Sequence, residues 1–429
     1  MKNNSIWILS IGHLITDINQ GALPAMLPFF ISAYDLSYTA AASIVFAANL
    51  ASSIIQPLFG YLADKFSKPW LLSIGLILAG SGLGLTGLCN NYQLIMVLAV
   101  ISGIGIAAYH PEGARLVHFE AGDKKNTAMS IFGVGGTIGF ALGPFLITTS
   151  LIQWGLKGTI ILIFPVSVMA ILMATQYPRF KSIVRKNSMN SNSSQEQELK
   201  EDWYSFIMLT VVIIGRSVIF FSLNTFIPIY WITYLNQSKM TGSLALTLFA
   251  ASGILGNLMG GSLADKYGPK KILLIGFWGL TILLPVFCFV DSPYISLLLM
   301  FPIGLILYAS YSPSIVLGQS YLPNRVGLSS GITLGVAISI GGAITPLIGK
   351  IADVYGVWSG ILTIACLPIF IFLMALSLPD PQSNNREQKT AQSKDKNYSN
   401  CDFQKRSTRR LGYSSRDREN LILKLMSKR

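Results

Sequence analysis

Apolar stretches of membrane-spanning length alternate with short polar segments along most of the chain. About twelve of them contain roughly 20 residues each, the length that crosses the hydrocarbon core of a bilayer as an α-helix. They begin near residues 6, 39, 69, 92, 127, 155, 204, 240, 270, 293, 327 and 355. The pattern predicts an all-α integral membrane protein with twelve transmembrane helices. Only Lys2 precedes the first stretch as a basic residue and Asp17 interrupts it, so we expect a retained helix rather than a signal peptide.

Composition and charge support a membrane protein and predict its orientation. Hydrophobic residues make up 52% of the chain and charged residues only 12%, which is unusual for a soluble protein. The even-numbered loops carry fourteen lysine and arginine residues, whereas Lys157 and Lys239 fall in odd-numbered loops. Because cytoplasmic loops carry the excess of lysine and arginine, both termini are predicted to be cytoplasmic.

A polar segment divides the chain into two halves of nearly equal length. Residues 177–203 are rich in serine, asparagine and charged side chains, and we expect them to form a cytoplasmic central loop that does not pack. This loop separates an N-terminal six-helix half, residues 1–176, from a C-terminal six-helix half, residues 204–378. Residues 379–429 carry thirteen basic and six acidic side chains. We predict that they form a disordered cytoplasmic tail, drawn to anionic lipids rather than to nucleic acid.

The two halves repeat each other in sequence. The stretch GYLADKF at residues 60–66 recurs as GSLADKY at residues 261–267, an offset of 201. Tyr109 recurs as Tyr311 at an offset of 202, together with the proline two residues later. A weaker copy, GKIADVYG at residues 349–356, falls in a loop on the opposite side of the membrane. This pattern is expected when each half contains two three-helix units of inverted topology.

The repeated elements resemble the loop signature of the major facilitator superfamily, in which an aspartate follows a glycine by four residues and basic residues come next. The stretch GVGGTIGFALGP at residues 133–144 resembles a glycine-rich element of exporters in that superfamily. Two further stretches, GHLITDINQGALPAMLPFF at residues 12–30 and AYHPEGARLVH at residues 108–118, are similar to the fosmidomycin-resistance type of efflux protein. The resemblance covers residues 1–378. It implies proton-driven export, by antiport, of a small anionic or amphiphilic toxic compound across a bacterial inner membrane.

The first apolar stretch carries an ionisable group where membrane helices rarely have one. His13, Asp17 and Gln20 are spaced by four and three residues, so they lie on one face of a helix. A carboxylate at mid-bilayer costs about 2.5 to 3.5 kcal/mol on insertion scales, and burial favours its protonated form. We therefore expect Asp17 to bind and release the coupling proton, with His13 and Gln20 facing the substrate. The alternative is that these side chains only join helices by hydrogen bonds.

A second group of ionisable residues surrounds a proline in the fourth stretch. In the sequence YHPEGARLVH, Pro111 predicts a kink beside His110, Glu112 and Arg115. Glu112 and Arg115 are three residues apart and can pair, whereas an imidazole titrates near neutrality. Our hypothesis is that His110 and Glu112 couple protonation to helix movement and that Arg115 contributes to the substrate path. The alternative is that Arg115 anchors a helix end and Glu112 neutralises it.

The C-terminal half lacks the counterparts of these titratable groups. Ser312 and Ser314 stand at the positions that correspond to the histidine and glutamate of the N-terminal half. This half offers Arg216 instead, well inside its first apolar stretch. Because arginine keeps its charge, it needs an acidic partner, an anionic ligand or an anchoring position at the membrane surface. We expect Arg216 to contact a phosphonate-like group of the substrate, together with Asn224, Tyr308 and Tyr311.

The repeated loop elements are expected to gate transport rather than to bind substrate. Aspartates at helix ends can join two helices in one state and release them in another. A glycine at every fourth position permits close helix contact and hinge motion. The predicted gating residues are Gly60, Asp64 and Lys65, their counterparts Gly261, Asp265 and Lys266, and Gly139, Gly143 and Pro144.

Other chemistry finds little support in the sequence. It has no phosphate-binding loop for ATP, and its four cysteines are dispersed without metal-site or disulfide spacing. We therefore predict a monomeric, non-enzymatic transporter of small molecules in the lipid bilayer, without metal or cofactor, that uses the proton as its coupling ion. Two alternatives stay open. One is uptake of a small metabolite, and the other is a membrane sensor that signals through its basic tail.

Overall fold

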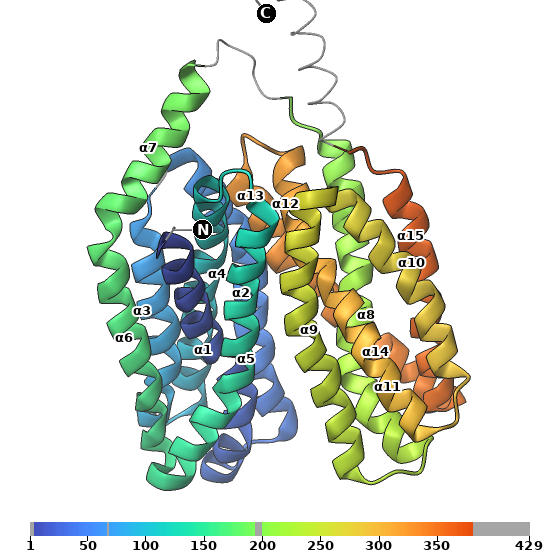
Figure 1. Cartoon of the computed structure of the whole chain (residues 1–429). Helices are drawn as coiled ribbons and strands as arrows, with labels where there is room; N and C mark the ends of the chain where they lie inside the picture. Colours follow the sequence, from blue (N-terminus) through green and yellow to red (C-terminus); the bar gives the residue numbers. More distant parts are fainter. Residues whose placement is uncertain (1–3, 67, 194–199, 381–429) are drawn as a thin grey trace, which may run out of the picture. The chain divides into compact units, whose positions relative to one another are not determined.

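The computed structural model describes residues 4–66, 68–193 and 200–380, and its regular elements are helical (Figure 1). Residues 1–379 form one compact unit, and both predicted halves belong to it. The predicted basic tail, residues 379–429, lies outside the described residues except for its first two positions.

The N-terminal half is drawn from blue to green in Figure 1. Its elements are α1 (Asn4–Tyr34), α2 (Tyr38–Phe66), α3 (Trp70–Gly84), η1 (Thr86–Leu88), α4 (Tyr92–Glu120), α5 (Lys125–Trp154), η2 (Gly155–Leu162), α6 (Ile163–Thr175) and α7 (Tyr177–Ser193).

The C-terminal half continues from light green to orange. Its elements are α8 (Trp203–Thr233), α9 (Lys239–Tyr267), α10 (Pro269–Cys288), α11 (Pro293–Ala309), α12 (Tyr311–Tyr321), α13 (Val326–Gly331), η3 (Ile332–Val336), α14 (Ala337–Tyr355) and α15 (Val357–Leu376). The segment η3 is a single turn of π-helix between α13 and α14.

Polar caps and glycines set several helix ends. Asn91, Asp202 and Ser238 precede α4, α8 and α9, and each side chain accepts a hydrogen bond from a backbone N–H in the first turn. Gly268 and Gly356 follow α9 and α14 with φ angles of 95° and 89°, a backbone conformation that favours glycine. Both glycines end copies of the repeated loop element, so the element carries glycine where the chain turns.

Ten helical segments among the described residues are long and apolar enough to cross a membrane. One of them, Lys125–Thr175, contains α5, η2 and α6, which the sequence predicts as two membrane helices. The helix α1, which has several buried polar side chains, is not among the ten. The finding shows a multi-pass membrane protein, whereas the number twelve stays a prediction.

Glycines hold α1 tightly against α5. A methyl group built on Gly139 would lie 2.0 Å from the Leu14 carbonyl oxygen, and one on Gly143 would lie 2.3 Å from that of Ile18. Only a hydrogen fits at these positions, so the two backbones touch. The close contact expected from glycines at every fourth position is present, and it fixes the helix that carries His13 and Asp17.

The central segment differs from the predicted loop in one respect. Residues Tyr177–Ser193 form α7, and Phe180, Ile183 and Val184 on this helix are buried. Apolar residues spaced by three and one make a helix stripe that packs against α4. The expectation that the segment does not pack was wrong for this part, because its serines and asparagines obscured the stripe. Residues 194–199 lie outside the described part.

Candidate functional site

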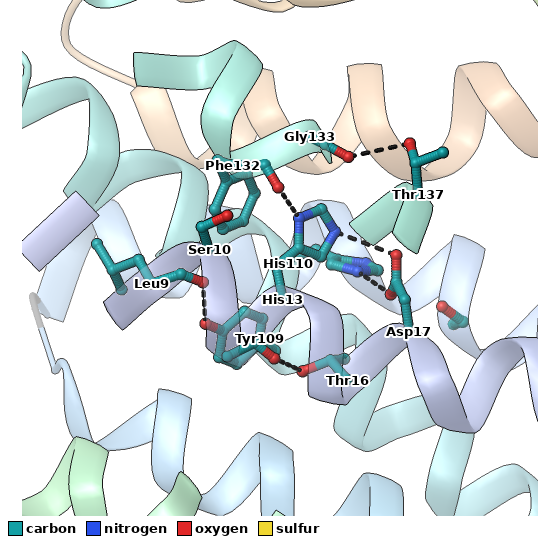
Figure 2. A network of polar contacts seen from close by, with 12 residues as sticks. Leu9, Ser10, His13, Thr16, Asp17, Tyr109, His110, Phe132, Gly133 and Thr137 are labelled. Carbon is teal, nitrogen blue, oxygen red and sulfur yellow. Dashed lines mark hydrogen bonds and ion pairs between the residues drawn. The ribbon is translucent and has the colours of Figure 1, made fainter. Parts of the chain in front are cut away.

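Asp17 lies between two histidines in the interior of the N-terminal half (Figure 2). Asp17 is only 9% exposed, and its neighbours on α1 include other polar residues. Its Oδ1 is 2.9 Å from Nε2 of His110 on α4, and its Oδ2 is 3.2 Å from Nε2 of His13 one helical turn away. The sequence placed His13 and Asp17 on one helix face, and the fold adds His110 from another helix.

The remaining ring nitrogens define where protons sit. Nδ1 of His13 is 2.7 Å from the Phe132 carbonyl oxygen, which can only accept, so this nitrogen carries a hydrogen. Nδ1 of His110 is 3.3 Å from Nε2 of Gln56, so it accepts from the amide and its hydrogen lies on Nε2, which donates to Asp17. A second proton must therefore sit between His13 and Asp17, either on the imidazole or on the carboxyl group. Removing that proton would leave two lone pairs facing each other.

Three helices fix this arrangement. Tyr109 on α4 donates to the Leu9 carbonyl oxygen at 2.7 Å (Figure 2). Ser10 on α1 donates to the Ile131 carbonyl oxygen at 2.6 Å. A methyl group on Gly136 of α5 would lie 2.6 Å from Oδ2 of Asp17. The cluster is therefore enclosed by α1, α4 and α5, and small shifts between these helices alter it.

The same cluster is the one place among the described residues where three ligand-type side chains converge. One nitrogen or oxygen from each of His13, Asp17 and His110 lies within 4.8 Å of the others. Direct hydrogen bonds between the imidazoles and the carboxylate already account for these atoms. We therefore interpret the cluster as a site for a proton.

Glu112 and Arg115 form a separate buried pair. The Arg115 Nε and Nη2 atoms donate to the two carboxylate oxygens of Glu112 at 2.8 and 2.9 Å, and both side chains are almost fully buried. Pro111 lies inside α4, which continues as one helix from Tyr92 to Glu120. The structure thus divides the predicted cluster: His110 faces Asp17, whereas Glu112 neutralises Arg115 on the same helix. This geometry favours the alternative, structural interpretation of the pair.

Arg216 on α8 is 4% exposed and holds its charge without a carboxylate partner among the described residues. Its Nε lies 3.0 Å from the Ser310 hydroxyl, and its Nη2 lies 3.1 Å from the Leu307 carbonyl oxygen. The guanidinium carbon is 5.1 Å from the ring centre of Tyr311. These dipoles hold a cation in place without neutralising it, which leaves it free to attract an anion.

Tyr311 connects this cation to the proton cluster. A methyl group on Gly133 of α5 would lie 3.0 Å from the Tyr311 ring, and Gly133 directly follows Phe132, the residue whose carbonyl holds His13. The centre of the same Tyr311 ring lies 5.1 Å from the guanidinium carbon of Arg216. Tyr308 packs edge-on against Phe220 near the same arginine. Arg216 of the C-terminal half and the proton cluster of the N-terminal half therefore both lie near Tyr311.

Two predicted substrate residues lie apart from these contacts. Asn224 donates to the Phe220 carbonyl oxygen of its own helix at 2.8 Å, and the partly exposed Gln20 makes no hydrogen bond to a described residue. The structure adds Gln56, which the sequence did not single out. A lone glutamine in an apolar stretch gives no signal until its neighbour His110 is known.

The two loop-signature aspartates each reach the other half of the protein. Asp64 accepts from the backbone N–H groups of Gly327 and Leu328 at 2.8 and 2.9 Å, in the first turn of α13. Asp265 accepts from those of Asn126 and Thr127, both at 2.9 Å, in the first turn of α5. A carboxylate at a helix N-terminus is favoured by the free N–H groups and the helix dipole. The predicted gating aspartates therefore join the halves in this conformation.

The helix contacts around these aspartates form two seams. The first seam consists of Ser53, Gln56, Gly60 and Asp64 on α2 against Gly327, Gly331, Gly335 and Ser339; the second consists of Asn257, Gly261 and Asp265 on α9 against Asn126, Ser130 and Gly133 on α5. Within the described part of the chain, the predicted gating lysines make no contact in either seam. Lys65 and Lys266 lie over the aromatic rings of the residues that follow them, at 5.5 and 5.0 Å.

Comparisons with known proteins agree with this architecture. A sequence model of the Major Facilitator Superfamily (MFS) matches residues 9–346 and 206–418. The chain is 29% identical over 379 residues to the fosmidomycin resistance protein of Escherichia coli (strain K12), and the match covers 87% of this chain and 92% of that protein. It is 28% identical over 394 residues to the uncharacterized MFS-type transporter YfnC of Bacillus subtilis (strain 168), with the same coverage. The structure of the MFS transporter FucP in the outward conformation superposes with a TM-score of 0.70 at 16% identity, over 87% of this chain and 98% of that one.

Proposed function

The chain belongs to the Major Facilitator Superfamily, whose members are membrane transporters and not enzymes, and we propose that it exports a small toxic compound in exchange for protons. The proposed transporter crosses a bacterial inner membrane with twelve helices, keeps both termini in the cytoplasm and works as a monomer. Its two halves rock around a central site and expose that site to each side in turn. The proton is the coupling ion, and the mechanism needs no other cofactor.

The observation that carries the proposal is the buried Asp17 carboxylate between His13 and His110. One proton decides whether the contact between His13 and Asp17 attracts or repels. His13 and Asp17 both lie on α1, but His13 is held by the Phe132 carbonyl of α5 and Asp17 by His110 of α4, so repulsion between His13 and Asp17 strains the contacts of α1 with both helices. A titration at this cluster therefore becomes a rearrangement of α1, α4 and α5.

Arg216 supports an anionic group on the exported compound. A buried arginine held by a hydroxyl, a carbonyl and an aromatic ring gains most from a ligand that brings negative charge. A phosphonate such as fosmidomycin has this charge, and the similarity to the fosmidomycin resistance protein supports the same class of compound. Tyr308 and Tyr311 would line the path beside it.

The seams support alternating access. Asp64 and Asp265 hold the two halves together where the loop signatures lie, so the described conformation is closed on that side. Its fold neighbour was solved in the outward conformation. Opening that side requires both carboxylates to leave the helix ends they cap.

Uptake of a small metabolite is the second candidate. The proton cluster and the two seams set coupling and gating, but neither contact fixes the direction in which substrate moves. Importer and exporter differ in which protonation state binds the substrate more tightly, and this difference is measurable. A non-transporting sensor would bind ligand without moving it.

The deciding experiment measures fosmidomycin survival and accumulation in cells that express the wild type, Asp17→Asn, Arg216→Ala or Asp35→Asn. Asp35→Asn is the matched control, because this carboxylate is exposed and follows the same helix. We expect drug exclusion by energised wild-type and control cells, and its loss in Asp17→Asn or after an uncoupler. Accumulation equal to that of cells without the transporter, despite confirmed expression, would refute export of this drug.

A further inference from the structure

Gln56 occupies a position between the proton cluster and the first seam. It is 3% exposed, and its Nε2 lies 3.3 Å from Nδ1 of His110 and 3.4 Å from the Ser52 hydroxyl. Its Oε1 is buried and has no hydrogen-bond partner among the described residues. One end of this amide therefore contacts a titratable ring, and the other end is left unsatisfied.

The unsatisfied end faces the C-terminal half. A methyl group on Gly335 would lie 2.7 Å from Oε1 of Gln56, and one on Gly331 would lie 2.6 Å from its backbone oxygen. Gly335 belongs to the π-helical turn η3. Single π-helical turns inside helices occur often at functional sites, because they leave the local hydrogen-bond ladder irregular. The Gln56 amide thus lies against η3, the turn between α13 and α14 whose backbone hydrogen bonds already depart from the α-helical pattern.

The second seam repeats this arrangement with different chemistry. Asn257 follows Gln56 at the repeat offset of 201, and its Oδ1 accepts from the hydroxyl of Ser312, the counterpart of His110. A methyl group on Gly133 of the opposite half would lie 3.1 Å from Nδ2 of Asn257. In both halves an amide therefore contacts the same position of the neighbouring helix and a glycine across the seam. Only the N-terminal copy contacts a group that titrates.

We propose that Gln56 is the positioning residue through which protonation of His110 is transmitted to the first seam, an inference that rests on the proposed proton coupling. In the described arrangement Nδ1 of His110 accepts from the amide. When a proton binds to Nδ1, this nitrogen becomes a donor and repels the amide N–H. The amide then rotates by half a turn, which places Oε1 on the imidazolium and Nε2 against Gly335.

The surroundings of His110 favour such a switch. The titratable groups that face its ring are Asp17 and His13 on α1 and the adjacent Tyr109, with ring contacts of 4.8 Å to His13 and 6.5 Å to Tyr109. From α2 the ring meets Gln56, which does not titrate. The Asp17 carboxylate stabilises an imidazolium, and rotation gives the unsatisfied Oε1 a donor. Rotation therefore replaces Oε1 of Gln56 by Nε2 against Gly335 in the first seam, without a movement of the backbone of α2.

Cross-linking of the first seam tests the proposal without a substrate. The hydroxyls of Ser53 and Ser339 are in direct contact across it, so a Ser53→Cys, Ser339→Cys pair reports seam closure in a protein whose native cysteines are replaced by serine. The yield at each pH is expressed relative to that of the same cysteine pair in His110→Gln, because disulfide formation itself needs a thiolate and so depends on pH. With Gln56 present, we expect this relative yield at fixed oxidation time to change about threefold between about pH 5.5 and pH 8.

Variants of Gln56 distinguish a role in transmitting protonation of His110 to the first seam from a purely structural role. Gln56→Leu keeps the volume but neither donates nor accepts, so its yield should not vary with pH. The carboxylate of Gln56→Glu can only accept, so it holds His110 protonated. This variant should therefore give the yield found at acid pH over the whole range. It tests the proposal if Gln56→Leu does not fold. Asn257→Leu is the matched control, and its yield should still follow pH, because Asn257 contacts Ser312 rather than a group that titrates. A wild-type yield that is flat, or a Gln56→Leu yield that still follows pH, overturns the proposal.

The transport assay distinguishes this inference from the proposed function. If energised cells do not exclude the drug while cross-linking still follows pH through Gln56, proton-driven export fails and the link stands. If export depends on Asp17 and the proton gradient while Gln56→Leu keeps the pH dependence of cross-linking, the link alone fails.

Discussion

Asp265→Asn is expected to open the second seam by an amount that follows from its contacts. Its carboxylate accepts four hydrogen bonds, from the backbone N–H and side-chain amide of Asn126 and from the N–H and hydroxyl of Thr127. Asparagine keeps one accepting oxygen and turns a donor toward Thr127. Hydrogen bonds to charged groups contribute about 1.5 to 3 kcal/mol each, and the helix N-terminus adds about 0.3 to 1 kcal/mol. Such contributions are not additive, so we expect Asp265→Asn to lose about 2 to 4 kcal/mol of the free energy that favours the closed seam. This loss lowers the closed-to-open ratio roughly 30- to 700-fold.

Alkylation of a buried cysteine measures this ratio. Ser130 is fully buried in the second seam and donates to the Asn257 carbonyl oxygen at 2.8 Å. When opening is fast, Ser130→Cys reacts with a maleimide at a rate proportional to the open population, so the rate should rise at least about tenfold with Asp265→Asn. Asp64→Asn should act in the same direction. Asp353→Asn, an exposed aspartate in the weaker copy of the element, should leave the rate unchanged. A rise below about twofold in both gate variants of folded protein would refute the gating argument.

Three further results are expected. Arg216→Ala should weaken binding of an anionic substrate by about 2 to 5 kcal/mol in equilibrium binding, whereas Arg216→Lys should recover part of it because the charge remains. Glu112→Gln should lower stability by about 3 to 5 kcal/mol in detergent unfolding, because it removes the charge of the carboxylate that pairs with the buried Arg115. Replacing both residues by leucine should be milder. Gly136→Ala should destabilise the protein by about 1 to 3 kcal/mol and abolish proton-driven transport, because the new methyl group meets Asp17. An equal loss of affinity with Arg216→Lys and Arg216→Ala would contradict the first argument. Additive effects of the Glu112 and Arg115 substitutions on stability would contradict the second. Normal proton-driven transport by Gly136→Ala would contradict the third.

The sequence predicts features that depend on local spacing. His13 and Asp17 share a face because they are four residues apart, and Asp64 and Asp265 were identified as joining helices because they end a repeated element. The family follows from the same motifs. These patterns need only a helix period and a repeat offset, both of which are visible in one dimension.

Features that depend on pairing between distant segments escaped the sequence. The grouping of His110 with Glu112 and Arg115 followed from adjacency, but a helix turns about 100° per residue, so His110 points to α1 while Glu112 bonds one turn ahead. Gln56 is an ordinary residue until the fold brings His110 and Gly335 to its two ends. Likewise Phe180 and Ile183 needed a partner surface on α4 before their stripe had a meaning.

The polar face of α1 has a consequence for how the protein is made. This helix carries several buried polar side chains and is not among the ten described helices that are long and apolar enough to cross a membrane. The glycine surface that receives it lies on α5, which ends at Trp154. At about 5 to 20 residues per second, a ribosome needs about 6 to 24 s to continue from the end of α1 to that point. During this interval α1 is expected to stay beside the translocon rather than enter lipid. Chains whose synthesis stops before residue 154 should therefore be degraded, and synthesis past α5 should release α1 into the bilayer.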